Sequence, residues 1–207
     1  MNTTPAQPPP QRKQFLLLLA IFTLPVLAAY AVYFLFPGLR PTGTTNYGQL
    51  VAPTARPLPA FDLRDADGKP AVAGLFKGKW SMVYVGAADC AQACQSEIYL
   101  SRQVRTSLAL NARRLQRLYI ATDAQSLAAA KALFPPTEHP DLLLLADAGT
   151  PGSRAADFFQ PGQPDALYMV DPLGNWFMLY PPKADQNADF KGIGKDLKKL
   201  LNQSQVD

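Results

Sequence analysis

The pattern of apolar and polar positions divides the 207-residue chain into one long apolar run and a series of shorter elements. The run "FLLLLAIFTLPVLAAYAVYFLF", residues 15–36, contains no charged side chain. Its length is typical of an α-helix that crosses the hydrocarbon core of a bilayer. A cleaved signal peptide is the alternative, but "VYFLF" extends the run beyond the usual length of a signal sequence. We therefore predict one uncleaved transmembrane helix.

The charges beside this run predict its orientation. Arg12 and Lys13 precede it closely, whereas Arg40 follows it. Basic residues next to a membrane span stay preferentially on the cytoplasmic side. We therefore expect residues 1–14 to form a cytoplasmic tail, and everything after the run to lie on the other side of the membrane.

Two further regions follow the apolar run. Residues 37–59, "PGLRPTGTTNYGQLVAPTARPLP", are rich in Pro, Gly and Thr and have no regular apolar period, which is typical of an extended linker. Residues 60–207 are long enough to bury one sizeable core without the help of disulfides. The sequence thus predicts one folded domain behind an anchor and a linker.

Short apolar runs and longer helical stretches alternate within the predicted domain. Short apolar runs bounded by turn signals indicate buried strands, and long stretches without Gly or Pro indicate helices. In chain order we predict a strand ("WSMVYVGA"), a helix (residues 93–118), a strand ("RLYIAT"), a helix ("AQSLAAAKALF") and a strand ("DLLLLAD"). A strand hairpin ("DALYMV" with "NWFMLY") and a basic helix ("NADFKGIGKDLKKLLNQ") follow. This order requires crossover connections and predicts a mixed sheet flanked by helices, an α/β arrangement typical of thioredoxin-like folds.

Charge and histidine content exclude several classes of function. The chain has 20 basic and 16 acidic residues and a net charge of +4, but three of the basic residues flank the apolar run. The predicted domain is close to neutral, so nothing indicates a nucleic-acid partner. Lys191, Lys195, Lys198 and Lys199 make the last helix basic, which is compatible with a solvated face or with docking to an acidic partner or lipid headgroups. A single histidine, His139, leaves no arrangement for a Ser-His-Asp hydrolase.

The two cysteines of the chain, Cys90 and Cys94, stand where the first buried strand passes into the long helix. Free N–H groups and the helix dipole at such a point favour a thiolate, although Asp89, if it caps the helix, would oppose one. Four helical residues rise about 6 Å, which suits a disulfide or two thiolates that converge on Cu(I). The spacing therefore leaves three alternatives: a redox couple, a metal site, or a local staple worth about 2 kcal/mol.

The anchor, the predicted thioredoxin-like domain, the CxxxC motif and the late segment "YMVDPLGNW" together resemble the Sco/SenC family of copper-handling assembly factors of cytochrome c oxidase. The resemblance covers residues 61 to about 201 and rests mainly on the order of elements. It implies that Cys90 and Cys94 are two copper ligands. It also implies that the protein lies in the inner membrane with its domain in the periplasm, and that its partner is a cytochrome c oxidase subunit or another membrane assembly factor.

The chain departs from the family pattern at several positions. The third copper ligand of the family is a histidine a few residues before the tyrosine that corresponds to Tyr168, and here that position is Gln163. The proline within the family's cysteine motif is also missing. We expect His139 to be an ordinary surface residue, and we expect Met169 and Met178, which could offer thioether sulfur, to lie in the core.

The sequence and the resemblance predict that the protein assists cytochrome c oxidase assembly through Cu(I) handling by the CxxxC pair, and two alternatives remain open. Cys90 and Cys94 could carry Cu(I) during oxidase assembly, because two thiolates suffice to hold that ion. They could instead work as a thiol–disulfide oxidoreductase, which needs only an attacking thiolate and a resolving partner. The third hypothesis is a non-catalytic scaffold that presents a surface to a membrane complex.

Overall fold

The computed structural model of the protein describes residues 11–36, 38, 45–51, 55–86, 89–159 and 163–204. The chain forms two compact units, Met1–Thr45 and Asn46–Asp207, each of which we describe by itself. The second unit contains the sheet and the whole hydrophobic core, so it has what a domain needs to fold alone.

The first unit consists of the helix α1, Gln11–Leu35. Its apolar side chains are exposed along its length, and the mean hydropathy is 2.5 over Arg12–Leu35. The helix is long and apolar enough to cross a membrane. Most of the predicted cytoplasmic tail, residues 1–10, lies outside the described residues.

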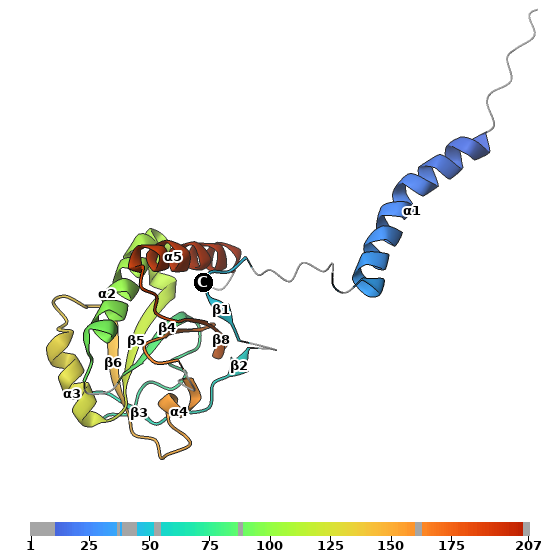
Figure 1. Cartoon of the computed structure of the whole chain (residues 1–207). Coiled ribbons are helices and arrows are strands. Elements are labelled where there is room, and N and C mark those ends of the chain that lie inside the picture. Colours follow the sequence, from blue (N-terminus) through green and yellow to red (C-terminus); the bar gives the residue numbers. More distant parts are fainter. Residues whose placement is uncertain are drawn as a thin grey trace, which may run out of the picture. The chain divides into compact units, whose positions relative to one another are not determined.

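The second unit is built on one mixed sheet (Figure 1). Three parallel strands, β4, β5 and β6, form its centre, and the antiparallel hairpin β7–β8 extends it beyond β4. The strand order is β1-β8-β7-β4-β5-β6-β3, with β2 also paired to β8. The strands are β1 Gln49–Leu50, β2 Arg56–Pro57, β3 Leu63–Arg64, β4 Trp80–Gly86, β5 Leu115–Ala121, β6 Leu142–Asp147, β7 Leu167–Val170 and β8 Asn175–Tyr180. The predicted mixed sheet is confirmed.

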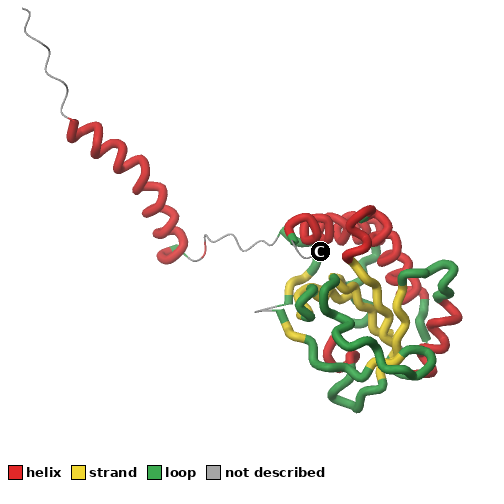
Figure 2. The backbone as a smooth tube through the Cα atoms, turned by 180° about the vertical axis from the view of Figure 1, so that it is seen from behind, coloured by secondary structure: helices red, strands yellow, loops and turns green. Residues whose placement is uncertain are grey.

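Helices cover both faces of the sheet, as Figures 1 and 2 show. One face packs against three helices: α2, α3 and α5. The other face packs against the short helix α4 and the chain that leads from β2 to β4. The helices are α2 Gln92–Ser107, α3 Ala124–Leu133, α4 Ala155–Phe159 and α5 Gln186–Gln203, with a 3-10 turn at Ala109–Arg114.

The helix predicted over residues 93–118 is shorter in the structure. It ends at Ser107, and Ala109 then takes a left-handed backbone conformation with φ of 50°. The chain from Leu115 onward is a strand because its side chains are buried by neighbours on both faces of the sheet. Among them is Arg117, which is only 1% exposed although it is charged. Tertiary burial therefore overrides the local helical pattern here.

The sheet also includes residues that the sequence assigned to the linker. Strands β1 and β2 pair with the outer edge of β8, and this pairing satisfies backbone groups that an open edge would leave exposed. Tyr47 fixes the start of the unit against α5, where its hydroxyl donates to Asp189 Oδ1 (2.8 Å). The Tyr47 and Gly48 N–H groups both donate to Asp196 Oδ2 (2.9 Å). Residues 37, 39–44 and 52–54 of the predicted linker lie outside the described residues.

The predicted hairpin forms around the turn Asp171–Gly174. Asp171 Oδ1 accepts from the N–H groups of Leu173 (2.9 Å) and Asn175 (2.8 Å). Gly174 has a φ of 88°, a value that glycine adopts without strain. The turn residues thus specify the hairpin locally.

Candidate functional site

The sheet places the two cysteines at the carboxyl end of the central strand β4. This strand ends at Gly86 and α2 begins at Gln92, so Cys90 precedes the helix and Cys94 lies in its first turn. The predicted position at the strand–helix junction is confirmed. Ala87 and Ala88, between the strand and Asp89, lie outside the described residues.

Cys90 and Cys94 are joined by a disulfide, with their Cα atoms 5.2 Å apart. Both are nearly buried, Cys90 at 9% and Cys94 at 3% exposure. Gln95 Nε2 donates to the Cys90 carbonyl oxygen (3.0 Å) and so fixes the backbone before the helix. Cys90 is the more accessible sulfur-bearing residue of the pair.

Asp89, which the sequence left open as a cap of α2, is not its N-cap residue. The N-cap residue is Ala91, which has no side-chain hydrogen bond to the helix. The helix starts too late for Asp89, two residues earlier, to reach its first N–H groups as a cap does.

Two stacked tyrosines lie on the same face of the sheet, within the same buried cluster as the cysteines. The rings of Tyr84 and Tyr119 have centroids 5.5 Å apart, and Tyr84 Oη donates to Asp165 Oδ1 (2.5 Å). Gly86 packs so closely against both rings that any Cβ at this position would overlap them. Burial, and next Asp89, raise the pKa of Tyr119 to about 12, and burial with the Asp165 bond raises the pKa of Tyr84 further. Both tyrosines stay neutral at physiological pH.

Glu97 is a buried acid that sequence reasoning missed. It lies one helical turn after Cys94 and is 3% exposed, and no hydrogen bond or ion pair joins its carboxyl to any residue that the structure describes. Burial first, and then the charges of Asp189 and Asp165, raise its pKa to about 7. The sequence could have indicated this burial, because Glu97 stands next to Ile98 on the helix face that continues to Ser101 and Val104 and is buried in the structure.

The remaining candidate ligands are not gathered around the cysteines. Gln163, the position at which the resemblance led us to look for a histidine, has a backbone carbonyl that accepts from Tyr168 Oη (2.9 Å). Within the described part of the chain, no group of three or more His, Cys, Asp or Glu residues could hold a metal ion. Met169 and Met178 oppose each other across β7 and β8 and are 0% and 2% exposed. Their predicted place in the core is confirmed.

A comparison with protein-family models decides the family. The model described as the transmembrane-like, thioredoxin-like C-terminal domain matches residues 80–204, more than half of the chain. The chain belongs to this thioredoxin-like family. The match covers the central sheet from β4 onward, the cysteine pair and α5. A sequence search of curated proteins finds no match.

Solved structures similar to this thioredoxin-like family member include several Sco proteins. The apo Sco1 protein of Thermus thermophilus aligns with a TM-score of 0.54 at 20% identity, covering 78% of this chain and 98% of that one. Copper-bound ScoI of Arabidopsis thaliana gives a TM-score of 0.50 at 21% identity, covering 67% and 96%. BsSco, described as a cytochrome c oxidase assembly protein with a disulfide switch, gives 0.51 at 16% identity, covering 73% and 99%. At these identities the likeness establishes the fold.

His139 is buried in this family member, which corrects the expectation of a surface residue. It is 7% exposed, and its ring meets the Phe134 ring edge-on with centroids 5.3 Å apart. Its Nδ1 has no hydrogen-bond partner among the residues that the structure describes. The Pro-flanked loop folds inward because the aromatic ring fills space beside Phe134. His139 precedes β6, whereas the cysteines follow parallel strand β4, so the histidine lies at the opposite end of the sheet from the pair.

We expect His139 to make stability depend on pH. Burial, and then the charges of Arg117 and Arg102, lower its pKa from the usual 6.5. The folded state therefore favours the neutral ring, and this contribution is present above pH 6.5 and is lost as the pH falls through and below that value. Urea unfolding of wild type and His139→Phe between pH 7.5 and 5.5 checks this, because phenylalanine keeps the ring contact but cannot titrate. A wild-type loss no larger than that of the variant would contradict the assignment.

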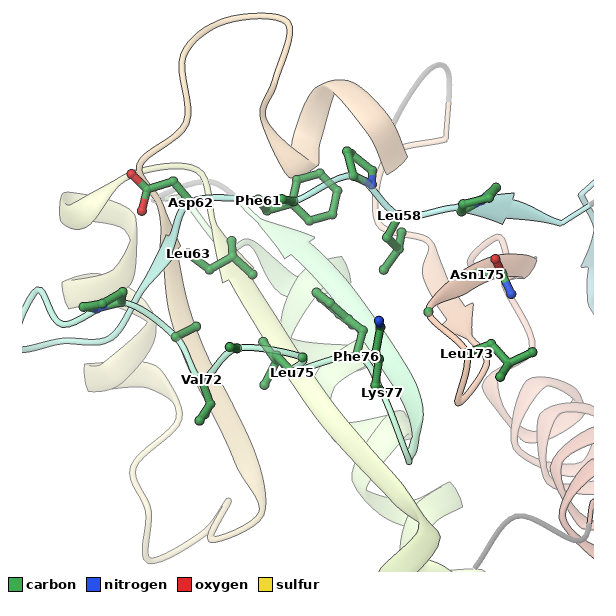
Figure 3. A pocket seen from close by; sticks show the side chains of 18 residues that line it. Leu58, Phe61, Asp62, Leu63, Val72, Leu75, Phe76, Lys77, Leu173 and Asn175 are labelled. Atoms are coloured by element: carbon green, nitrogen blue, oxygen red, sulfur yellow. The ribbon is translucent and has the colours of Figure 1, made fainter.

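One cavity of this family member lies away from the cysteines. It has a volume of about 610 Å³ and is lined mainly by apolar side chains of the chain between β2 and β4 and of the β7–β8 turn. Figure 3 shows Leu58, Phe61 and Phe76 around it, with Leu173 at its edge. The turn borders the start of β4, since the Gly78 N–H donates to the Pro172 carbonyl (2.9 Å). The residues that line it pack on the sheet face opposite to the one that carries the cysteines.

Proposed function

We propose that this protein is a membrane-anchored, Sco-like assembly factor whose Cys90–Cys94 pair exchanges disulfides with a partner protein. The observation that carries the proposal is the pair itself: two cysteines at the amino end of α2, at disulfide distance, with no third metal ligand among the described residues. The helix N-terminus favours a thiolate in the reduced pair.

The exchange proceeds in two balanced steps. The Cys90 thiolate, on the more exposed residue, attacks a disulfide of the partner, forms a mixed disulfide and releases one partner thiolate. Cys94, as a thiolate, then attacks the Cys90 sulfur, forms the intramolecular disulfide and releases the second partner thiolate. Two electrons pass from the pair to the partner, whose thiolates take up protons, and a dithiol donor protein restores the reduced pair.

Carriage of Cu(I) as cargo is the second candidate, and the likeness in fold to copper-bound ScoI of Arabidopsis thaliana favours it. Two cysteine sulfurs fit a two-coordinate Cu(I) ion once the disulfide is reduced. The donor set does not fit a site that needs a histidine, because Gln163 stands at the family position and His139 lies at the opposite end of the sheet. The missing ligand is why we place disulfide exchange first.

The location and partner follow from the anchor and the resemblance. In this proposal α1 crosses the inner membrane, with Arg12 and Lys13 on the cytoplasmic side, and the domain works in the periplasm. The partner is a subunit of cytochrome c oxidase or another membrane assembly factor. The description of BsSco as a cytochrome c oxidase assembly protein with a disulfide switch supports this choice.

The proposal is tested on residues 46–207, the compact second unit, by two measurements. Equilibration with glutathione buffers, followed by thiol alkylation, should give a reversible reduction potential between about −300 and −120 mV, the range of exchange-active pairs. A potential below about −300 mV would identify a structural staple instead. Anaerobic Cu(I) titration against a competing chelator should show no binding beyond that of Cys90→Ser/Cys94→Ser. Stoichiometric binding that this control loses would make Cu(I) carriage the function.

The same double variant separates both chemistries from the scaffold hypothesis. In cells that depend on this protein, Cys90→Ser/Cys94→Ser should lose cytochrome c oxidase activity, although the anchor and the folded domain remain. Oxidase activity equal to that of wild type would show that the cysteines are dispensable and would favour a scaffold.

A further inference from the structure

The exposed face of α5 carries only positive charge. Lys191, Lys195 and Lys198 recur at four- and three-residue spacing, so they lie within about 60° of one another around the helix. All three are exposed, and no ion pair joins any of them to an acid that the structure describes. We call these three lysines the basic stripe.

The acids of α5 face inward and do not neutralise the stripe. Asp189 is 2% exposed and accepts from Tyr47 Oη, while Asp196 is 4% exposed and accepts from the N–H groups of Tyr47 and Gly48. Asp185, before the helix, caps its first turn through the N–H groups of Asn187 and Ala188. The helix thus uses its negative charges internally and presents its positive charges to solvent.

The buried side of α5 explains why the stripe faces outward. Ile193, Leu197 and Leu201 pack into the core beneath the sheet face shared with α2. No large apolar side chain of α5 is exposed, so this helix is suited to electrostatic contact with a charged surface rather than to insertion into an apolar one.

The chain that leads to the anchor enters the domain at α5. The Tyr47 ring lies directly against Gly192, one residue after the first lysine of the stripe, so closely that a Cβ there would overlap the ring. Between Phe36 and Thr45 there are nine peptide steps, and even fully extended these span at most about 32 Å. If α1 crosses the membrane, as proposed above, α5 cannot move far from the bilayer surface.

We propose that the basic stripe, Lys191, Lys195 and Lys198, binds the anionic phospholipid headgroups of the membrane that α1 crosses. Charge complementarity selects this occupant, and the short tether keeps it within reach. Because the tether holds the local concentration high, a contact that is weak for the free domain is sufficient in the whole protein. The contact orients the domain and, through the packing of α2 against α5, the cysteine pair at the amino end of α2.

The test measures co-sedimentation of residues 46–207, which lack α1, with vesicles of about 40% phosphatidylglycerol in phosphatidylcholine, at millimolar lipid and low salt. We expect binding to these vesicles and none to pure phosphatidylcholine. Each lysine should contribute roughly fivefold to the partition coefficient. Lys191→Gln/Lys195→Gln/Lys198→Gln should therefore reduce binding on the order of 100-fold.

A matched control removes the same charge elsewhere. Lys69→Gln/Lys79→Gln/Lys131→Gln changes three exposed lysines outside α5 and should keep most of the binding. Equal losses in the two triple variants would show a net-charge effect and overturn the proposal, as would no binding of the wild-type domain to phosphatidylglycerol vesicles. All variants should share one urea unfolding midpoint, because every altered lysine is exposed.

The outcome is independent of the proposed cysteine chemistry. Cys90→Ser/Cys94→Ser should bind the vesicles as wild type does, and both lysine variants should keep the wild-type reduction potential. Failure of vesicle binding therefore leaves disulfide exchange untouched. Conversely, an unreactive disulfide leaves the lipid contact of α5 standing.

Discussion

Methionine in place of Arg117 is expected to lower the free energy of unfolding by about 3 kcal/mol. Arg117 is 1% exposed and its guanidinium donates to Ser101 Oγ (3.0 Å), to the Ile98 carbonyl (2.8 Å) and to both carboxylate oxygens of Asp141. Methionine has a similar length but no donor. It removes a donor from the buried Ile98 carbonyl and Ser101 hydroxyl on α2, which keep only the hydrogen bond between them (2.8 Å). It also removes one of the two arginines that pair with Asp141.

Urea unfolding of the 46–207 unit measures this effect. Arg113→Met is the matched control, because Arg113 is exposed and its replacement should change stability by less than about 0.5 kcal/mol. If Arg117→Met were as mild as the control, the guanidinium would not be the link between α2, β5 and the start of β6. An unchanged dependence on urea concentration would show that the variant loses stability and not the fold.

Glutamine in place of Glu97 is expected to stabilise the protein increasingly as the pH rises. Burial raises the pKa of Glu97 from the usual 4.5 to about 7 in the folded state. The protonated carboxyl therefore contributes stability below pH 4.5, and that contribution is lost as the pH rises through about 7. Relative to wild type, Glu97→Gln should gain about 3 kcal/mol between pH 4 and pH 8.

Urea unfolding of oxidised wild type and Glu97→Gln across this range checks the expectation. Since His139 titrates in the same window with the opposite sign, the comparison is made as the difference between the two proteins. A difference that stays constant from pH 4 to pH 8 would mean that Glu97 ionises at its usual value.

The same measurement on reduced protein links Glu97 to the cysteines. Glu97 lies one turn after Cys94 on the buried face of α2, so a thiolate at the pair should raise the pKa of the carboxyl further. The difference in unfolding free energy between Glu97→Gln and wild type should then rise at a higher pH in the reduced protein than in the oxidised protein. A carboxyl whose pKa differs between the oxidised and the reduced protein makes the reduction potential depend on pH. The difference between the two pKa values of Glu97 therefore gives its contribution to that dependence.

The sequence by itself determined the features that depend on local pattern. Twenty-two uncharged residues are enough to specify an apolar helix, and the turn Asp171–Gly174 specifies its hairpin through its own side chain and its glycine. The alternation of strand and helix likewise predicts a mixed sheet. Because crossover connections place the carboxyl ends of parallel strands at one edge, the place of Cys90 and Cys94 could be predicted as well.

Only the tertiary structure decided which polar residues are buried. His139 and Arg117 look like surface residues, yet an aromatic neighbour and a shared carboxylate hold them inside. Glu97 became a candidate only when its burial without a partner among the described residues was seen. The residues before β3 joined the sheet because β8 offers an open edge. The pKa of a side chain and the pairing of an edge depend on groups distant in the chain, which no local pattern records.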